Sequence, residues 1–268
     1  MTKTICIASG KGGVGKTTLS INLAMALVES GRRVLYFDAD MGLANAQIGL
    51  GATSVVNISH VLNNLVTLPE IVLKTPHGID LIAGASGLAE LAAINKIESA
   101  SIIRQFSSLP DQYDVLIVDC AAGISQSVLS FLEGCQIRVV VGTNELSSIA
   151  DAYGLIKVMV HDYALNDFFY LPNLVDNERQ GAKLYESMNK VMKNFLSTEL
   201  NYAGSIPKEM LVDSSWRKAT PLIKLAPTSV MTTAIRKVAN TLMNHDAQVF
   251  SSRGVQFLME RTRPIHEN

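Results

Sequence analysis

This chain of 268 residues has few cysteines, a net charge close to zero and no long apolar run. Its three cysteines, Cys6, Cys120 and Cys135, include no C-x-x-C pair, so we expect reduced thiols rather than a disulfide framework or a paired metal motif. The net charge of -1 excludes a global positive field that would hold nucleic acid or an anionic membrane, so any such contact must be local. There is no apolar run of about 18 residues that could span a bilayer, and the first residues do not resemble a signal peptide. We therefore expect a cytoplasmic protein.

Apolar residues make up 48% of the chain, which is enough to bury one large core. Strand patterns alternate with helical patterns along the sequence. The expected strands are residues 4–9, 34–37, 78–82, 113–119, 137–141 and 168–171, and the expected helices are residues 17–30, 99–107, 124–134, 147–163, 181–197 and 228–245. This alternation predicts an α/β fold with a doubly wound, mainly parallel sheet flanked by helices.

A glycine-rich loop at residues 10–17 follows the first strand and fits G-x-x-x-x-G-K-[ST]. Its glycines allow successive backbone N–H groups and a helix N-terminus to surround phosphate oxygens. Lys16 would then reach the β- and γ-phosphates, and the Thr17 hydroxyl would bind Mg²⁺. The nucleotide-binding residues expected here are Gly12, Gly13, Val14, Gly15, Lys16, Thr17 and Thr18. Strand, loop and helix occur in the required order, so this signal is specific.

Two further strands end in carboxylates. Asp38 and Asp40 end the second strand, and Asp119 ends the run at residues 113–119, as in a Walker B sequence. Asp38 and Asp119 are our candidates for the Mg²⁺ site together with Thr17, and Gly123 would offer a backbone N–H to the γ-phosphate. A single aspartate at a strand end is a helix cap or a turn residue as often as it is a metal ligand. The three aspartates in this order are a more specific signal.

A second lysine in the loop, Lys11, points to one family among the proteins with such a loop. Together with Lys16 and the segments 38–45 and 119–123, it resembles the deviant-Walker ATPases of the MinD/ParA group. Within that group, the segments 84–87, 121–125 and 145–157 look most similar to the FlhG/FleN branch of flagellar-number regulators. The resemblance covers nearly the whole chain.

This resemblance implies a slow ATPase that uses ATP and Mg²⁺ and works as an ATP-dependent homodimer. Lys11 would reach across the dimer to the partner's phosphates, and Asp40 would orient the attacking water, so Lys11, Lys16 and Asp40 are the candidate catalytic residues. In the family, adenine lies between a strand-end asparagine and an Ile-Pro-x-Asp loop. Asn173, Pro207 and Glu209 stand at those positions here, with glutamate in place of aspartate, and Asn173 could equally be a turn residue.

Two departures from the branch stand out. FlhG proteins carry an N-terminal extension that stimulates the GTPase FlhF, whereas this chain begins directly with its first strand, which puts that activity in doubt. Leu146 also replaces the proline that usually precedes the helix at residues 147–163. In that helix Ser148 and Asp151 have the spacing of a capping box; in the family, the equivalent region lies near the dimer and partner surface, and both interpretations stay open.

Apolar residues in the last third have two interpretations. Leu184, Met188, Val191, Met192 and Phe195 form a helical stripe that we interpret as core, with a partner groove as the alternative. We assign residues 1–250 to the ATPase domain and residues 251–268 to a tail. Its short amphipathic pattern could fold back on the body or lie on the inner face of the membrane through Val255, Phe257, Leu258 and Met259, where a dimer would present two copies.

The sequence therefore favours a MinD-like switch that acts through protein partners to control the number or placement of a surface structure, most simply flagella. A ParA-like DNA-partitioning ATPase is the alternative, but the near-neutral charge argues against nucleic acid as a partner. A MinD-type regulator of the division septum is a further alternative. An iron–sulfur relative would need cluster cysteines, and Cys120 is more simply a small buried residue.

Overall fold

The computed structural model describes residues 2–42, 44–84, 94–110, 112–246 and 255–258. Nine strands form its sheet, in the order β3-β4-β2-β5-β1-β6-β7-β8, with β9 paired to β7. All the pairings are parallel except that of β3 with β4. The strands are β1 (Lys3–Ser9), β2 (Val34–Ala39), β3 (Val72–Lys74), β4 (Ile79–Ile82), β5 (Val115–Ala122), β6 (Ile137–Gly142), β7 (Phe169–Val175), β8 (Asn201–Tyr202) and β9 (Ile206–Pro207).

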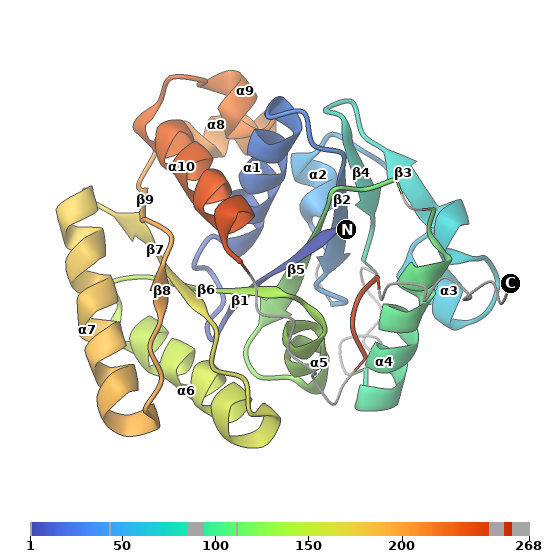
Figure 1. Ribbon diagram of the computed structural model, residues 1–268. Helices are drawn as coiled ribbons and strands as arrows, with labels where there is room; N and C mark the ends of the chain where they lie inside the picture. Colours follow the sequence, from blue (N-terminus) through green and yellow to red (C-terminus); the bar gives the residue numbers. More distant parts are fainter. Residues whose placement is uncertain (1, 43, 85–93, 111, 247–254, 259–268) are drawn as a thin grey trace, which may run out of the picture.

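Helices cover both faces of the sheet (Figure 1). One face packs against α1, α2, α9 and α10, and the other packs against α3, α4, α5, α6 and α7. The α-helices are α1 (Lys16–Glu29), α2 (Ala46–Gly49), α3 (Ile58–Leu62), α4 (Lys96–Gln105), α5 (Gln126–Gly134), α6 (Leu146–Tyr163), α7 (Glu178–Leu196), α8 (Val212–Arg217), α9 (Leu222–Leu225) and α10 (Val230–Asn244); the 3-10 helices are η1 (Leu68–Ile71) and η3 (Phe106–Ser108).

The sheet has two hydrophobic cores because alternate residues of each strand point to opposite faces. In β1, Ile5 and Ile7 pack with α1 and α10, whereas Cys6 and Ala8 pack with α5 and α6. The predicted doubly wound α/β fold is confirmed. Among the described residues, no helix has both the length and the apolar character needed to cross a membrane.

Side-chain caps explain where several helices begin. Asn95 accepts hydrogen bonds from the amides of Ile97 and Glu98, so α4 begins at Lys96, three residues before the expected start. Asn177 accepts from the amide of Gln180 and likewise starts α7 early. Of the two interpretations of Ser148, the capping box is wrong, because α6 already begins at Leu146 and the Ser148 hydroxyl accepts from the amide of Thr143 at 3.0 Å.

The apolar stripe of α7 divides between core and solvent. Leu184, Met188 and Met192 are buried as expected, whereas Val191 and Phe195 are exposed, with Phe195 at 72%. The interpretation as core is therefore correct for Leu184, Met188 and Met192 and wrong for Val191 and Phe195.

The tail also differs from its expected structure. Residues 255–258 form no helix, and the ring of Phe257, which is 4% exposed, packs against Phe37, Phe106 and Phe131. Val255 and Leu258 are half-buried against the same core, and the Phe257 amide donates to the Gly134 carbonyl at 3.0 Å. Of the two interpretations of the tail, the structure therefore shows residues 255–258 folded back on the body, against the core of the domain assigned to residues 1–250, and membrane contact stays a prediction. Met259 lies outside the described residues.

Candidate functional site

The predicted site residues meet at the carboxyl ends of adjacent strands. β1 leads into the glycine-rich loop, β2 ends at Ala39 with Asp38 just before it, β5 carries Asp119, and β7 carries Asn173. Asp38 and Asp119 are direct partners in the register of β2 and β5. Crossover connections in a parallel sheet place ligand sites at this edge, and the sequence had indicated the same position.

Glycine geometry shapes the phosphate loop. Gly13 and Gly15 have φ angles of 78° and 85°, a region that L side chains rarely adopt. A Cβ on Gly10 would lie 2.2 Å from backbone atoms of Asp151 in α6, so only glycine allows α6 to pack against the loop. The loop then turns directly into α1, whose first backbone N–H groups have no partners within the helix and can bind an anion.

Asp119 lies at the centre of the site and is 1% exposed. Its Oδ2 accepts a hydrogen bond from the Tyr36 hydroxyl at 2.9 Å, whereas its Oδ1 has no partner in the described part of the protein. Burial raises the pKa of Asp119 above its ordinary value, although the Lys16 charge and the hydroxyls of Thr17 and Tyr36 oppose that change. The sequence missed Tyr36, although it lies two residues before Asp38 on the same side of β2.

Asp38 is the second buried carboxyl. Its Oδ2 accepts from the amide of Ala46 at 2.9 Å and its Oδ1 from the amide of Asp40 at 3.2 Å. Burial and the nearby Asp119 raise the pKa of Asp38 to about 8, and these two amides act in the opposite direction. An additional cation beside these two buried carboxyls would favour their charged forms.

Mg²⁺ is a cation of the kind that this carboxyl pair could bind. It prefers oxygen ligands and usually combines one or two carboxylates with phosphate oxygens and water. The orphaned Asp119 Oδ1 and the Thr17 hydroxyl supply oxygens of the right kind. Within the described ranges, no group of three histidine, cysteine or carboxylate side chains could hold a metal ion. A cation here would therefore need the phosphates to complete its ligand set.

Unfolding of the nucleotide-free protein should depend on pH through Asp38. Its pKa is about 8 in the folded state and about 3.9 in an unfolded chain, so between these values the folded state holds the extra proton. The free energy of unfolding should therefore fall as the pH rises through this window. We expect the Asp38→Asn variant to lose much of this slope, equivalent to roughly 2–5 kcal/mol between about pH 5 and 8.5. Urea unfolding across that range measures it.

Asp114→Asn provides the control for this prediction. Hydrogen bonds from Arg33 hold the pKa of Asp114 at about 2, so this group titrates below the window and its removal should leave the slope intact. Equal slopes for the wild type and Asp38→Asn would show that Asp38 does not carry the extra proton.

Lys11 is bound within its own chain. Its Nζ lies 2.5 Å from Glu145 Oε2 and 2.9 Å from Ser147 Oγ, on either side of Leu146 at the start of α6. The sequence pattern gave no sign of this ion pair, whose partners are 134 residues apart. The pair is largely exposed, so it adds little stability. Lys11 can therefore leave it at small cost.

Two expected groups are already engaged. The Gly123 amide donates to the Ser9 carbonyl at 2.9 Å, and its contact with the γ-phosphate stays a prediction. An Asp40 carboxylate oxygen accepts from the amide of Gly42 at 3.2 Å. Either group would have to exchange its partner to contact a nucleotide.

The expected adenine contacts lie next to one another. Asn173, 1% exposed, donates from Nδ2 to the Val14 carbonyl at 2.7 Å, and its Oδ1 has no partner in the described part of the protein. β9, which includes Pro207, pairs with β7 beside it. Glu209 is half-buried, and its Oε1 accepts from the amide of Leu211 at 3.2 Å. A buried, unpaired carbonyl oxygen fits the exocyclic amino group of adenine, because that group is a donor.

Comparison with known proteins agrees with this geometry. The family model described as the CobQ/CobB/MinD/ParA nucleotide binding domain matches residues 5–222. The chain is 35% identical to antiactivator FleN of Pseudomonas aeruginosa, covering 96% of this chain and 92% of FleN. It is 36% identical to the flagellum site-determining protein YlxH of Helicobacter pylori, covering 91% and 82%.

Solved structures give the same answer. The septum site-determining protein MinD complexed with Mg-ADP from Pyrococcus horikoshii is similar with a TM-score of 0.74 and 27% identity, covering 89% of this chain and 95% of that one. A chain of the MinC:MinD cell division protein complex from Aquifex aeolicus is similar with a TM-score of 0.76 and 25% identity, covering 94% of this chain and 100% of that one. The predicted resemblance to the MinD group and to its flagellar branch is confirmed. This chain belongs to the CobQ/CobB/MinD/ParA family of nucleotide-binding domains.

Proposed function

We propose that this protein is a MinD-type ATPase that binds ATP with Mg²⁺, dimerises, and controls the number or placement of flagella. The observation that carries the proposal is the joint presence of the phosphate loop, the paired buried carboxyls and the additional Lys11 at one sheet edge. Similarity to FleN and YlxH over nearly the whole chain supports the flagellar role.

Binding would use the phosphate loop and the first turn of α1. The amides of Gly12, Gly13 and Gly15 and the ammonium of Lys16 hold the phosphates. Thr17, Asp38 and Asp119 would hold Mg²⁺ beside these phosphates. The bound metal would neutralise charge on the phosphate oxygens. Asn173 and the backbone at Pro207 would bind adenine.

Hydrolysis requires an oriented water molecule. Asp40 is a half-buried carboxylate two residues after the buried Asp38, just beyond the end of β2. It would orient water toward the γ-phosphate, while Lys16 stabilises the developing charge. Slow turnover suits a protein whose dimer acts as a timer.

The switch would be Lys11. Exchange of Glu145 and Ser147 for the phosphates of a second copy turns an intrachain ion pair into an intermolecular one. Ile124 and Leu146 beside the loop are 55% and 86% exposed and would be covered in such a dimer. The nucleotide therefore controls the oligomeric state.

Lys11→Ala is expected to keep nucleotide binding and to lose dimerisation with ATP. The reason is that Lys16 binds phosphate within its own chain, whereas Lys11 has only the partner's phosphates to bind once it leaves Glu145. Light scattering with a slowly hydrolysed ATP analogue measures the dimer, and calorimetry measures binding. Lys237→Ala, an exposed lysine of α10, is the matched control and should dimerise as the wild type does. A Lys11→Ala dimer of normal affinity would refute the role in trans.

The flagellar role is tested in cells. We expect a change in flagellar number or position when the chromosomal copy carries Lys11→Ala, and normal flagella with Lys237→Ala. A flagellar protein partner should be retained on the ATP-bound dimer in the cytoplasm. Unchanged flagella combined with ATP-dependent retention of nonspecific DNA on a filter would instead favour the DNA-partitioning alternative.

Membrane contact of this dimer would be peripheral and brief. Residues 255–258 are engaged in the core, so a lipid-binding role for the tail would require their release. Co-sedimentation with anionic liposomes in ATP and in ADP tests it, and equal sedimentation in both would argue against a nucleotide-controlled contact.

A further inference from the structure

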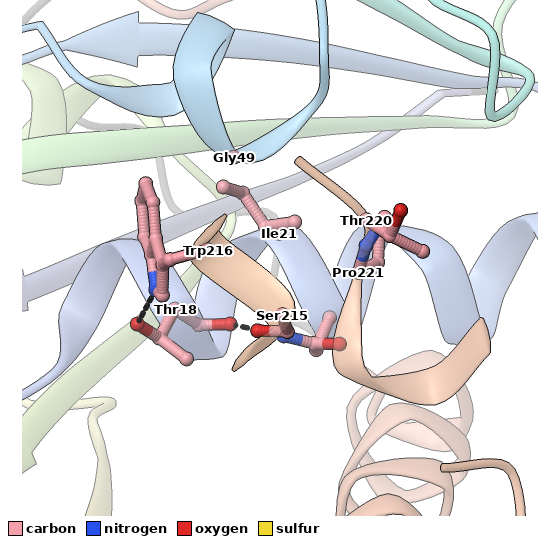
Figure 2. Close-up of a pocket in the computed structure, with 8 residues that line it drawn as sticks. Thr18, Ile21, Gly49, Ser215, Trp216, Thr220 and Pro221 are labelled. Carbon is pink, nitrogen blue, oxygen red and sulfur yellow. Dashed lines mark hydrogen bonds between the residues drawn. The ribbon is translucent and has the colours of Figure 1, made fainter. Parts of the chain in front are cut away.

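The chain's single tryptophan contacts the helix that begins in the phosphate loop. Trp216 lies on α8, and its indole Nε1 donates to Thr18 Oγ1 at 3.0 Å, although 198 residues separate the two (Figure 2). Thr18 directly follows Thr17 in the first turn of α1, where backbone N–H groups are unpaired and an anion is favoured. Trp216 therefore touches the proposed phosphate site indirectly, through one side chain.

This hydrogen bond fixes the role of the Thr18 hydroxyl. An indole N–H can only donate, and a hydroxyl has one proton and two lone pairs. With one lone pair occupied by Trp216, the hydroxyl proton must point elsewhere. It thus remains available to donate to a neighbouring acceptor such as a phosphate oxygen.

We propose that Trp216 is a positioning residue that orients the Thr18 hydroxyl as a hydrogen-bond donor to a phosphate of the bound nucleotide. The proposal rests on the nucleotide site proposed above and adds to it a residue from outside the phosphate loop. Trp216 itself makes no contact with the nucleotide in this role.

The surrounding packing holds both partners in place. A Cβ on Gly49, the last residue of α2, would lie 3.0 Å from Trp216 Cζ3 and 2.8 Å from Ile21 Cδ1, so glycine allows α2 to approach the indole ring. The Asn22 side chain donates to the Thr18 carbonyl at 2.7 Å and accepts from the amide of Ile223 at 3.0 Å. α8 thus holds the side chain of Thr18 directly, and α9 holds its carbonyl through Asn22. Figure 2 shows Thr18 and Trp216 among the residues that line the pocket between these elements.

A double-mutant cycle tests the assignment. Trp216→Phe keeps an aromatic ring and removes the N–H, and Thr18→Val keeps the shape of threonine and removes the hydroxyl. We expect Trp216→Phe to weaken Mg·ADP binding about threefold to tenfold, the usual effect of one neutral hydrogen bond. In a Thr18→Val background, the same substitution should have no further effect on the Kd. Calorimetry measures all four proteins.

The matched control lies on the same short helix. Ser215 donates to the Val212 carbonyl within α8, and Ser215→Ala should leave the Kd unchanged. A Trp216→Phe effect that is equally large with valine at position 18 would show general damage to α8 and overturn the proposal. Unchanged affinity in the single variant would overturn it as well.

Intrinsic fluorescence gives a second readout that needs no change at Trp216. Because the chain has one tryptophan, its emission reports the surroundings of Trp216, which include this contact. Mg·ADP should change the emission of the wild type, and saturating Mg·ADP should change that of Thr18→Val much less. An equal change in both would overturn the proposal even if Trp216→Phe failed to fold. Absence of ADP and ATP binding to the wild type by calorimetry would instead refute the proposed nucleotide site itself.

Discussion

A Lys16→Ala variant is expected to lose measurable binding of both ADP and ATP. Lys16 is buried beside the fully buried Asp119, and its charge opposes the rise in the pKa of that carboxyl. Its removal deletes the ammonium that would hold the β- and γ-phosphates and leaves two buried carboxyls without a nearby cation. Truncation of one partner of a buried charge pair costs about 2–5 kcal/mol, enough to move a micromolar affinity out of range. Calorimetry with Mg·ADP measures the loss.

Lys11→Ala is the informative comparison for that experiment. It lies in the same loop and carries the same charge, but its Nζ contacts Glu145 and Ser147 rather than the carboxyl pair. It should therefore bind ADP as the wild type does. Similar weakening in both variants would mean that the loop responds to its total charge, and the separate roles of the two lysines would be lost.

The phosphate and metal residues could be predicted from the sequence because their geometry is local. A strand, a glycine-rich loop and a helix occur within thirty residues, and the periodicity of each strand brings its last carboxylate to the same edge. Even Tyr36, the partner of Asp119, could have been predicted, because Tyr36 and Asp38 are two residues apart and so lie on the same face of β2.

Partners far apart in the sequence could not be predicted. Lys11 with Glu145, and Thr18 with Trp216, depend on how α6 and α8 pack against the loop and α1, and no residue spacing encodes that arrangement. Gly123 shows a similar limit, because the motif predicts where its amide lies but not that the Ser9 carbonyl binds it. Local patterns thus predicted where the site lies in the sheet. Tertiary packing determined which of its groups already have hydrogen-bond or ion-pair partners.

The tail illustrates an ambiguity of apolar spacing. Apolar residues at i, i+3 and i+4 show only that one face avoids water, and lipid or a protein core satisfies that requirement equally well. Here the deciding contacts come from Phe37, Phe106 and Phe131, which belong to three other elements. Their distance in the sequence from Phe257 hides the aromatic cluster.

Phe257→Ala is expected to destabilise the protein by about 3–5 kcal/mol, the usual range for removing a buried phenylalanine. The Phe257 ring lies 4.9 Å from that of Phe106 and 5.9 Å from that of Phe131, so its loss leaves a cavity among three aromatic neighbours. Urea unfolding followed by circular dichroism measures the change. Val255→Ala, two residues earlier and only half-buried, is the matched control and should cost much less.

The size of this effect decides between the two interpretations of the tail. A loss near 3–5 kcal/mol means that Phe257 contributes to the stability of the folded core and that any membrane contact must first extract it at comparable cost. A loss below about 1 kcal/mol, as for a surface substitution, would mean that the ring is rarely buried in solution. Residues 255–258 would then be free to bind lipid, and ATP-dependent co-sedimentation with liposomes should be abolished by Leu258→Glu without a change in thermal stability.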